Sequence, residues 1–275
     1  MTGGTRILDL LVLALALAGG LTGIAAWKRQ SAQALARAAF LLALGAAAAS
    51  WVVRWVLAGH LPLFGTYESG LSLALTILLV AACLGVGAHR IAALAWPVAS
   101  LVAAAVLLQG QFYDPKPYAL TISERSLVVD AHAVIAWLAF GVLTANAGVA
   151  IAILVRRSDE DSESRWLSRS LSAGFLLLSA MIVSGSLYRF MLFGSAWSFD
   201  PIETLALVVW LAYGTVLHMH RLGGWHGREL ARWCVAVFVA LVVSYRCIVL
   251  FPATATYHIF DIDLRLHRVG EESAP

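Results

Sequence analysis

Along the chain, long apolar runs alternate with short polar segments. A helix that crosses the hydrocarbon core of a bilayer needs roughly 20 consecutive apolar residues, and runs close to that length recur from one end of the sequence to the other. Runs of this length are typical of transmembrane helices, because buried strands are much shorter. The pattern predicts eight transmembrane helices, at about Ile7–Trp27, Ala38–Leu57, Leu71–Ala88, Ile91–Leu108, Ala131–Val155, Leu171–Tyr188, Ile202–His218 and Leu230–Leu250.

The composition agrees with a chain that lives in the bilayer. Of the 275 residues, 61% are hydrophobic and only 13% are charged, whereas charged residues make up about a quarter of a soluble globular protein. The net charge of +3 is small and its basic residues flank the apolar runs, so no nucleic-acid-binding surface is indicated. We therefore expect an all-α integral membrane protein with one polytopic domain over residues 1–275.

The basic residues predict which side of the membrane each end of a helix faces. Cytoplasmic loops carry an excess of Lys and Arg, and we expect the charged run Arg156–Arg165 to be a solvated connection on that side. Arg54 and Arg246 lie near the outer ends of their helices, where we expect them to snorkel outward. Eleven of the other basic residues fall on one side and six on the other, which places both termini outside: Lys28, Arg29, Arg37, Arg90, Arg156, Arg157, Arg165, Arg169, Arg221, Arg228 and Arg232 against Arg6, Lys116, Arg125, Arg189, Arg265 and Arg268.

The segment that joins the sixth and seventh predicted helices on the outer side has an unusual composition. Residues 193–204 combine several aromatic rings with two carboxylates. Asp200 before Pro201, with Glu203 three residues after Asp200, is typical of the start of a helix, and interfacial Trp and Phe belong to the aromatic belt of many membrane proteins. The density of rings around Gly194 also favours a surface for a large planar ligand.

Histidine gives a second indication at the same side of the membrane. His132, at the outer start of the fifth predicted helix, and His258, beyond the eighth, can both reach the face of Trp197, and imidazole is a common axial ligand of haem iron. His218 ends the seventh helix toward the inner leaflet, either as a functional residue or as an interface anchor. His60 is a weaker outward candidate, and we set aside the four histidines that remain as loop or tail residues: His89, His220, His226 and His267.

These residues match a known motif. The sequence resembles the CcsA/ResC-type cytochrome c biogenesis proteins, whose WWD domain carries an outward loop of the form WGxxWxWDPxET. Phe193 and Phe199 replace two family tryptophans, which keeps the aromatic face but loses an indole N–H donor. The resemblance extends over Leu61 to His258 and includes a tyrosine, glutamate, serine segment at residues 67–69. The loop positions that agree are Gly194, Trp197, Asp200, Pro201, Glu203 and Thr204.

The resemblance implies a set of haem-handling residues. By analogy with the family, His132 and His258 would ligate the iron of haem b at an outer site, and His218 would contribute to an inner site used in haem transport. The outward loop, residues 189–203, would surround the haem at the outer site. Its contributing residues would be Trp197, Phe199, Phe193, Gly194 and Asp200.

The resemblance also implies a function in cytochrome complex assembly. A system II protein of this kind works with a CcsB/ResB-like membrane subunit and presents haem to the CxxCH cysteines of apocytochrome c, in a bacterial inner (plasma) membrane or a thylakoid-type membrane. No residue in this chain is required to act as an acid or base, so ligase activity is expected of the complex. Two alternatives are a haem exporter or delivery protein without ligase activity, and a structural membrane subunit.

Overall fold

The structure, a computed structural model, describes residues 2–27, 29–84, 89–113, 115–116, 120, 124–157 and 161–247. Within these ranges the chain is helical, as the apolar runs predict. The elements are α1 (Thr2–Ala26), a 3-10 turn (Gln30–Ala32), α2 (Gln33–Ala58), α3 (Thr66–Cys83), α4 (His89–Gly110), α5 (Leu127–Arg156), α6 (Asp161–Phe193), α7 (Pro201–Leu222) and α8 (Gly227–Cys247).

Within the described residues, each of the eight predicted spans overlaps one of these helices, so the predicted all-α fold class is confirmed. Seven of the helices, α1 to α7, are long and apolar enough to cross a membrane, and α8 reaches the last described residue. The predicted ends are less accurate. The helix α6 has 33 residues and begins well before Leu171, because the polar segment Asp161–Ser170 continues the helix beyond its apolar run.

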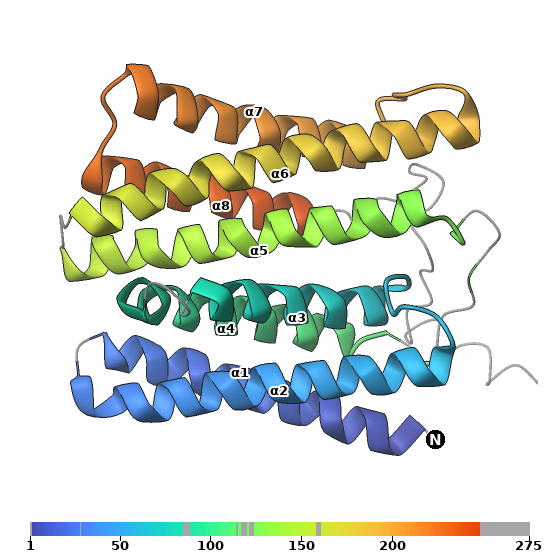
Figure 1. Cartoon of the computed structure of the whole chain (residues 1–275), viewed down its shortest axis with the longest axis horizontal. Coiled ribbons are helices and arrows are strands. Elements are labelled where there is room, and N and C mark those ends of the chain that lie inside the picture. The colour runs from blue at the N-terminus through green and yellow to red at the C-terminus, as the bar shows by residue number, and fades with distance from the viewer. Residues whose placement is uncertain are drawn as a thin grey trace, which may run out of the picture.

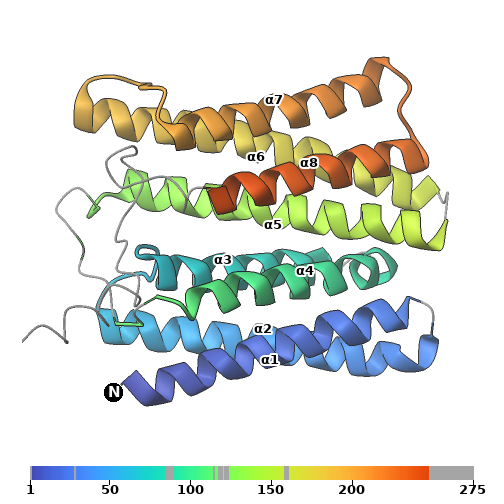
Figure 2. The same cartoon turned by 180° about the vertical axis from the view of Figure 1, so that it is seen from behind.

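The helices lie side by side along the longest axis of the molecule (Figures 1 and 2). The central helix is α5, with α3 and α4 on one side and α6 and α8 on the other. One end of the bundle carries the N-terminus and the connections α2–α3, α4–α5 and α6–α7. We call this end the N end. The aromatic loop and the start of α5 are therefore at the same end of the molecule.

Glycines allow the neighbours of α5 to pack closely against it. A Cβ atom on Gly148 would lie 2.9 Å from the Cα atom of Ala95 in α4, and one on Gly174 of α6 would lie 2.3 Å from a methyl carbon of Leu143. Close approach of this kind is a main source of attraction between helices in lipid, where no hydrophobic effect drives them together. The position of α5 is thereby fixed from both sides.

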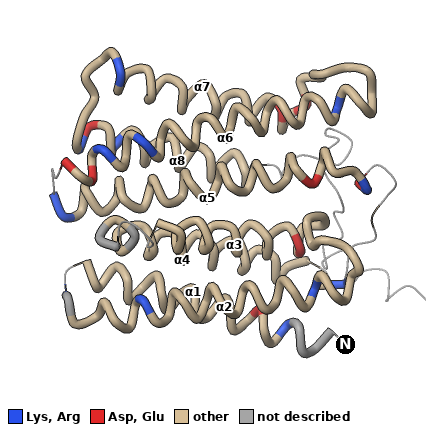
Figure 3. The backbone as a smooth tube through the Cα atoms, in the orientation of Figure 1, with Lys and Arg blue, Asp and Glu red and all other residues tan. Residues whose placement is uncertain are grey.

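Lys and Arg gather at the end opposite the N end (Figure 3). Two charged residues lie elsewhere than we expected. Arg54 does not snorkel outward, since its side chain is only 3% exposed and pairs with Asp9 of α1 at 2.8 Å. Glu163, in the run predicted to be a solvated connection, is fully buried and pairs with Arg156 at 3.0 Å. Neither partner could be identified from the sequence, because each pair joins two different helices.

Candidate functional site

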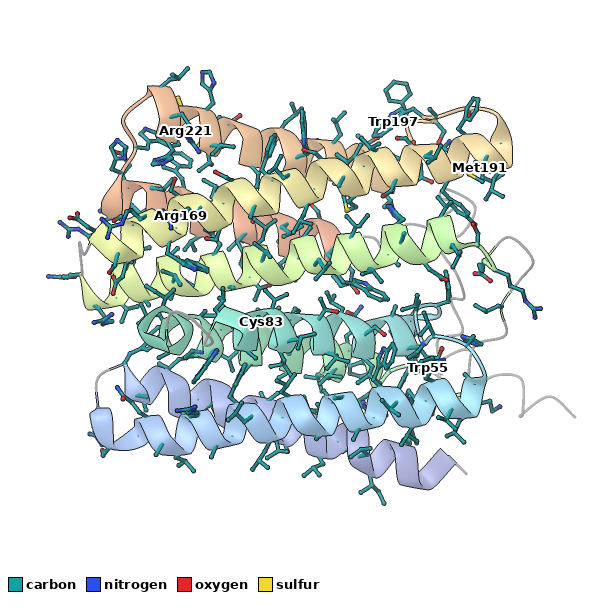
Figure 4. All side chains as sticks on the ribbon, in the orientation of Figure 1. Trp55, Cys83, Arg169, Met191, Trp197 and Arg221 are labelled. Carbon is teal, nitrogen blue, oxygen red and sulfur yellow. The ribbon has the colours of Figure 1, made fainter. Side chains whose placement is uncertain are left out.

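The aromatic loop begins where α6 ends. The backbone N–H of Gly194 donates to the carbonyl of Phe190 at 2.9 Å, and Gly194 has a φ of 70°, in the left-handed region that glycine adopts without strain. This conformation stops α6 and turns the chain toward α7. Trp197 lies on the connection that follows, at the N end of the bundle (Figure 4).

Two rings of the loop form a packed pair. The ring centroids of Trp197 and Phe199 are 6.4 Å apart with an interplanar angle of 84°, an edge-to-face contact. Phe199 is 80% exposed and has a φ of 59°, a conformation that is costly for a residue with a bulky side chain. Phe193, at the end of α6, is also exposed. The loop therefore exposes the rings of Phe193 and Phe199 at its surface, and Phe199 contributes backbone strain.

The two carboxylates hold the loop in this shape. Asp200 is the N-cap of α7, since its Oδ1 accepts from the backbone N–H of Ile202 at 2.8 Å and Pro201 follows at the first helical position. The helix-start pattern recognised in the sequence is thus present. Glu203 accepts from the backbone N–H of Ser198 at 2.8 Å and pairs with Arg189 of α6 at 3.4 Å. Glu203 therefore joins both ends of the connection.

His132 lies in the second turn of α5 and faces α6. Its Nδ1 atom is 3.0 Å from the carbonyl oxygen of Met181 and 3.1 Å from Oγ of Ser184. A carbonyl can only accept, so Nδ1 carries the hydrogen in this contact, which is the tautomer that offers Nε2 to a metal. The ring packs against Gly185, where a Cβ atom would lie 2.8 Å from Cε1. His132 is therefore held against α6 in the tautomer whose Nε2 can act as a metal ligand.

The distance between His132 and the aromatic loop can be gauged along α6. The ring of His132 contacts α6 at Gly185, and the loop starts at Gly194. Nine residues of helix correspond to roughly 14 Å. No contact between His132 and Trp197 occurs among the interactions of the described residues. The structure thus brings both to the N end of the α5–α6 pair but not into contact, and His258 lies outside the described residues.

Two further residues of interest at the N end, His60 and Tyr67, interact with residues of other helices. His60, in the α2–α3 connection, has Nδ1 2.9 Å from the carbonyl oxygen of Leu61 and interacts electrostatically with Asp130 in the first turn of α5. Tyr67, in the segment singled out by the resemblance, donates its hydroxyl to Oδ2 of Asp9 at 2.5 Å. Its neighbour Glu68 is buried.

At the opposite end of the bundle, the two histidines near the end of α7 differ in their exposure and contacts. His218 is exposed on α7. His220, which we had set aside, lies on the same helix, where Nε2 is 2.7 Å from Oγ of Ser168 and Nδ1 is 2.7 Å from the carbonyl oxygen of Trp225. His220 therefore joins α6 to the α7–α8 connection. This role could not be recognised from the sequence, because Ser168 is 52 residues away.

Sequence reasoning also missed Asp9, which accepts hydrogen bonds from residues of α2 and α3. A signal was present, since Asp9 is the only charged residue inside the apolar run Ile7–Trp27, and an ionised side chain in a membrane helix usually has a partner. Within the described residues, no group of three or more His, Cys, Asp or Glu side chains could hold a metal ion by itself.

Comparison with known proteins points to one family. The sequence profile described as "Cytochrome C assembly protein" matches residues 32–251. The protein named cytochrome c biogenesis protein CcsA of Synechococcus sp. strain CC9311 is 28% identical, covering 81% of this chain and 88% of that protein. The CcsA of strain CC9605 is 28% identical over 72% of this chain and 77% of its own. The CcsA of Prochlorococcus marinus strain NATL1A is 43% identical over 77 residues, 28% of this chain.

A solved structure shares the fold. The chain described as cytochrome c heme lyase CcmF superposes with a TM-score of 0.72 over 87% of this chain at 18% sequence identity. The match covers 46% of that longer chain, so this chain spans about half of its length. The arrangement of helices described above therefore recurs in a second protein.

Proposed function

This chain belongs to the cytochrome c assembly protein family, and from that membership we propose that it binds haem at the N end of its bundle and presents it for covalent attachment to an apocytochrome c. The observation that carries the proposal is His132. Its Nδ1 contact with the carbonyl of Met181 fixes the tautomer in which Nε2 can ligate iron. The same helix α6 that orients His132 also leads into the aromatic loop.

Each part of the site has a separate task in this proposal. His132 and His258 ligate the iron of haem b from its two faces. The rings of Trp197, Phe199 and Phe193 cover the macrocycle, for which flat apolar faces are suited. Asp200 and Glu203 take no part in bond making, since the hydrogen bonds of Asp200 and Glu203 hold the loop between α6 and α7. The contribution of the chain is positioning rather than acid–base chemistry.

The reaction served is thioether formation. The S–H group of each CxxCH cysteine adds across a vinyl group of haem: the carbon–sulfur bond forms, the vinyl π bond is lost, and the thiol hydrogen moves to the second vinyl carbon. No net oxidant or reductant is consumed. A CcsB/ResB-like subunit completes the ligase, in a bacterial inner (plasma) or thylakoid-type membrane. Haem transport from the inner side would use His218, which is exposed on α7. The partner subunit would supply the second ligand of the iron at this inner site.

The absorption spectrum of the purified complex tests the proposal. We expect the detergent-purified chain, co-expressed with a CcsB/ResB-like subunit, to carry haem with a Soret band that His132→Ala abolishes and added imidazole restores. His258→Ala tests the second ligand in the same way. His226→Ala is the matched control, because His226 is an exposed histidine at the opposite end of the bundle, and its spectrum should equal that of the wild type.

The outcomes separate the proposal from its alternatives. Haem that is absent from the wild type would refute the proposal and favour a structural subunit. Haem that is bound through His132 without any cytochrome c formation on co-expression with a CxxCH apoprotein would indicate an exporter or delivery protein instead. A Soret band that neither His132→Ala nor His258→Ala changes would refute the assignment of the iron ligands.

A further inference from the structure

A charged network lies buried in the half of the molecule that the proposed function does not use. Asp9 of α1 and Arg54 of α2 are 1% and 3% exposed, and their side chains pair at 2.8 Å. The Asp9 carboxylate also accepts the hydroxyl of Tyr67 from α3 at 2.5 Å and the hydroxyl of Ser50 from α2. The guanidinium of Arg54 stacks 4.3 Å above the centroid of the Tyr67 ring. Three helices therefore meet at one carboxylate.

A network of this kind is poorly explained by stability alone. Removing an aspartate and an arginine from water costs several kcal/mol for each ion, and well-packed apolar residues are often as stable as a buried pair. Its hydrogen bonds, in contrast, are directional and fix the positions of the groups that share them. The directional bonds of this network thus hold particular groups in place.

Arg54 makes a second hydrogen bond, to a residue outside the three helices. While Nη2 pairs with Asp9, Nη1 donates to the backbone carbonyl of Pro115, in the α4–α5 connection, at 3.1 Å. Pro115 is buried. One guanidinium thus anchors the connection that leads into α5, the helix of His132. An ammonium group, which lacks the planar fork, cannot reproduce both contacts with the same geometry.

One turn earlier on α2, Trp51 holds the other connection at this end. Its indole N–H donates to Oγ of Ser72 at 2.8 Å, and the Ser72 hydroxyl donates to the carbonyl of Pro62 at 2.5 Å. Pro62 belongs to the α2–α3 connection. The outer part of α2 therefore fixes one residue in each of the two connections that flank the start of α5.

These connections contact the elements of the proposed haem site. Leu63 and Phe64, directly after Pro62, form a small apolar cluster with Val129 in the first turn of α5, and Tyr188 of α6 packs against it. The residue after Tyr188 is Arg189, the partner of Glu203. These contacts lead from Trp51 through the α2–α3 connection to the starts of α5 and α7.

We propose that Arg54, held by Asp9, is a positioning residue that fixes the α4–α5 connection and through it the start of α5 that carries His132. It acts on the connection, not on haem directly. The effect on haem rests on the proposed function, whereas the effect on the connection does not.

Hydrogen–deuterium exchange in detergent tests the proposal directly. The informative variant is Asp9→Asn with Arg54→Gln, because the double substitution leaves no unpaired buried charge to unfold the protein. We expect peptides spanning 111–126 to exchange about tenfold faster, the factor lost with a hydrogen bond from a charged donor, while peptides of α7 keep their wild-type rates. Arg37→Gln removes an exposed arginine from the other end of α2 and should leave both regions unchanged.

Two further measurements sharpen the result. Trp51→Phe loses only the indole donor and should speed exchange in 59–65 but not in 111–126. Arg54→Lys should give an intermediate exchange rate in 111–126. Unchanged exchange in 111–126 in a folded double variant would overturn the proposal, as would acceleration spread evenly over all helices.

The haem spectrum separates this proposal from the proposed function. In a haem-loaded wild type, the double variant should show a shifted or weakened Soret band that Arg37→Gln does not show; an identical spectrum would overturn the link to His132. If the wild type binds no haem, the proposed function fails while the exchange experiment still decides whether Arg54 holds the connection.

Discussion

At the scale of single residues, Phe199 combines an exposed aromatic ring with a positive φ of 59°. A bulky residue in this region costs about 1 kcal/mol or more, and such strain persists where the side chain serves a function. We expect Phe199→Gly to raise the free energy of unfolding by about 1 kcal/mol and to lower the amount of haem bound. Thermal unfolding and the Soret absorbance measure the two effects.

The control for this prediction is Phe193→Ala. Phe193 is also exposed but lies at the helical end of α6, so its loss should reduce haem binding without any gain in stability. The explanation is wrong if Phe199→Gly is less stable than the wild type, or if it binds as much haem.

At the scale of helices, the packing of α5 against α4 depends on Gly148. A Cβ atom there would lie 2.9 Å from Cα and 3.0 Å from the carbonyl oxygen of Ala95, and backbone atoms cannot rotate away. We expect Gly148→Val to lower the free energy of unfolding by about 1–3 kcal/mol, as overpacking does in soluble cores. Gly45→Ala is the matched control, since a Cβ on Gly45 meets nothing within 4 Å and should raise stability by about 0.5–1 kcal/mol. Thermal unfolding in detergent compares the two.

The helices could be predicted from the sequence because each is marked by a local property, an apolar run of sufficient length. The start of α7 could also be predicted, since Asp200 and Pro201 determine it within one turn. The contacts between helices could not. Asp9 and Arg54 are 45 residues apart, and His220 and Ser168 are 52 apart, so no local pattern identifies these partners. For the same reason the prediction that Arg54 snorkels outward was wrong.

At the scale of the whole molecule, the distribution of charge predicts how the bundle sits in the membrane. Most described arginines lie at the end opposite the N end (Figure 3), and the positive-inside rule then places the aromatic loop outside. In a variant without native cysteines, we expect Ser195→Cys to react with a membrane-impermeant maleimide in intact cells. His226→Cys should react only after the cells are permeabilised. The opposite labelling pattern would show that the topology is inverted and would refute an outward haem site.

The buried pair of Asp9 and Arg54 also bears on how the protein is made. While α1 emerges from the ribosome, Asp9 has no partner, and a lone aspartate in a membrane helix is unfavourable at the translocon, by up to about 3 kcal/mol at the helix centre and by less near a helix end, where Asp9 lies. Its arginine follows 45 residues later on α2. We expect α1 to remain at the lateral gate until α2 has been synthesised, so that the first two helices enter the lipid together as a hairpin.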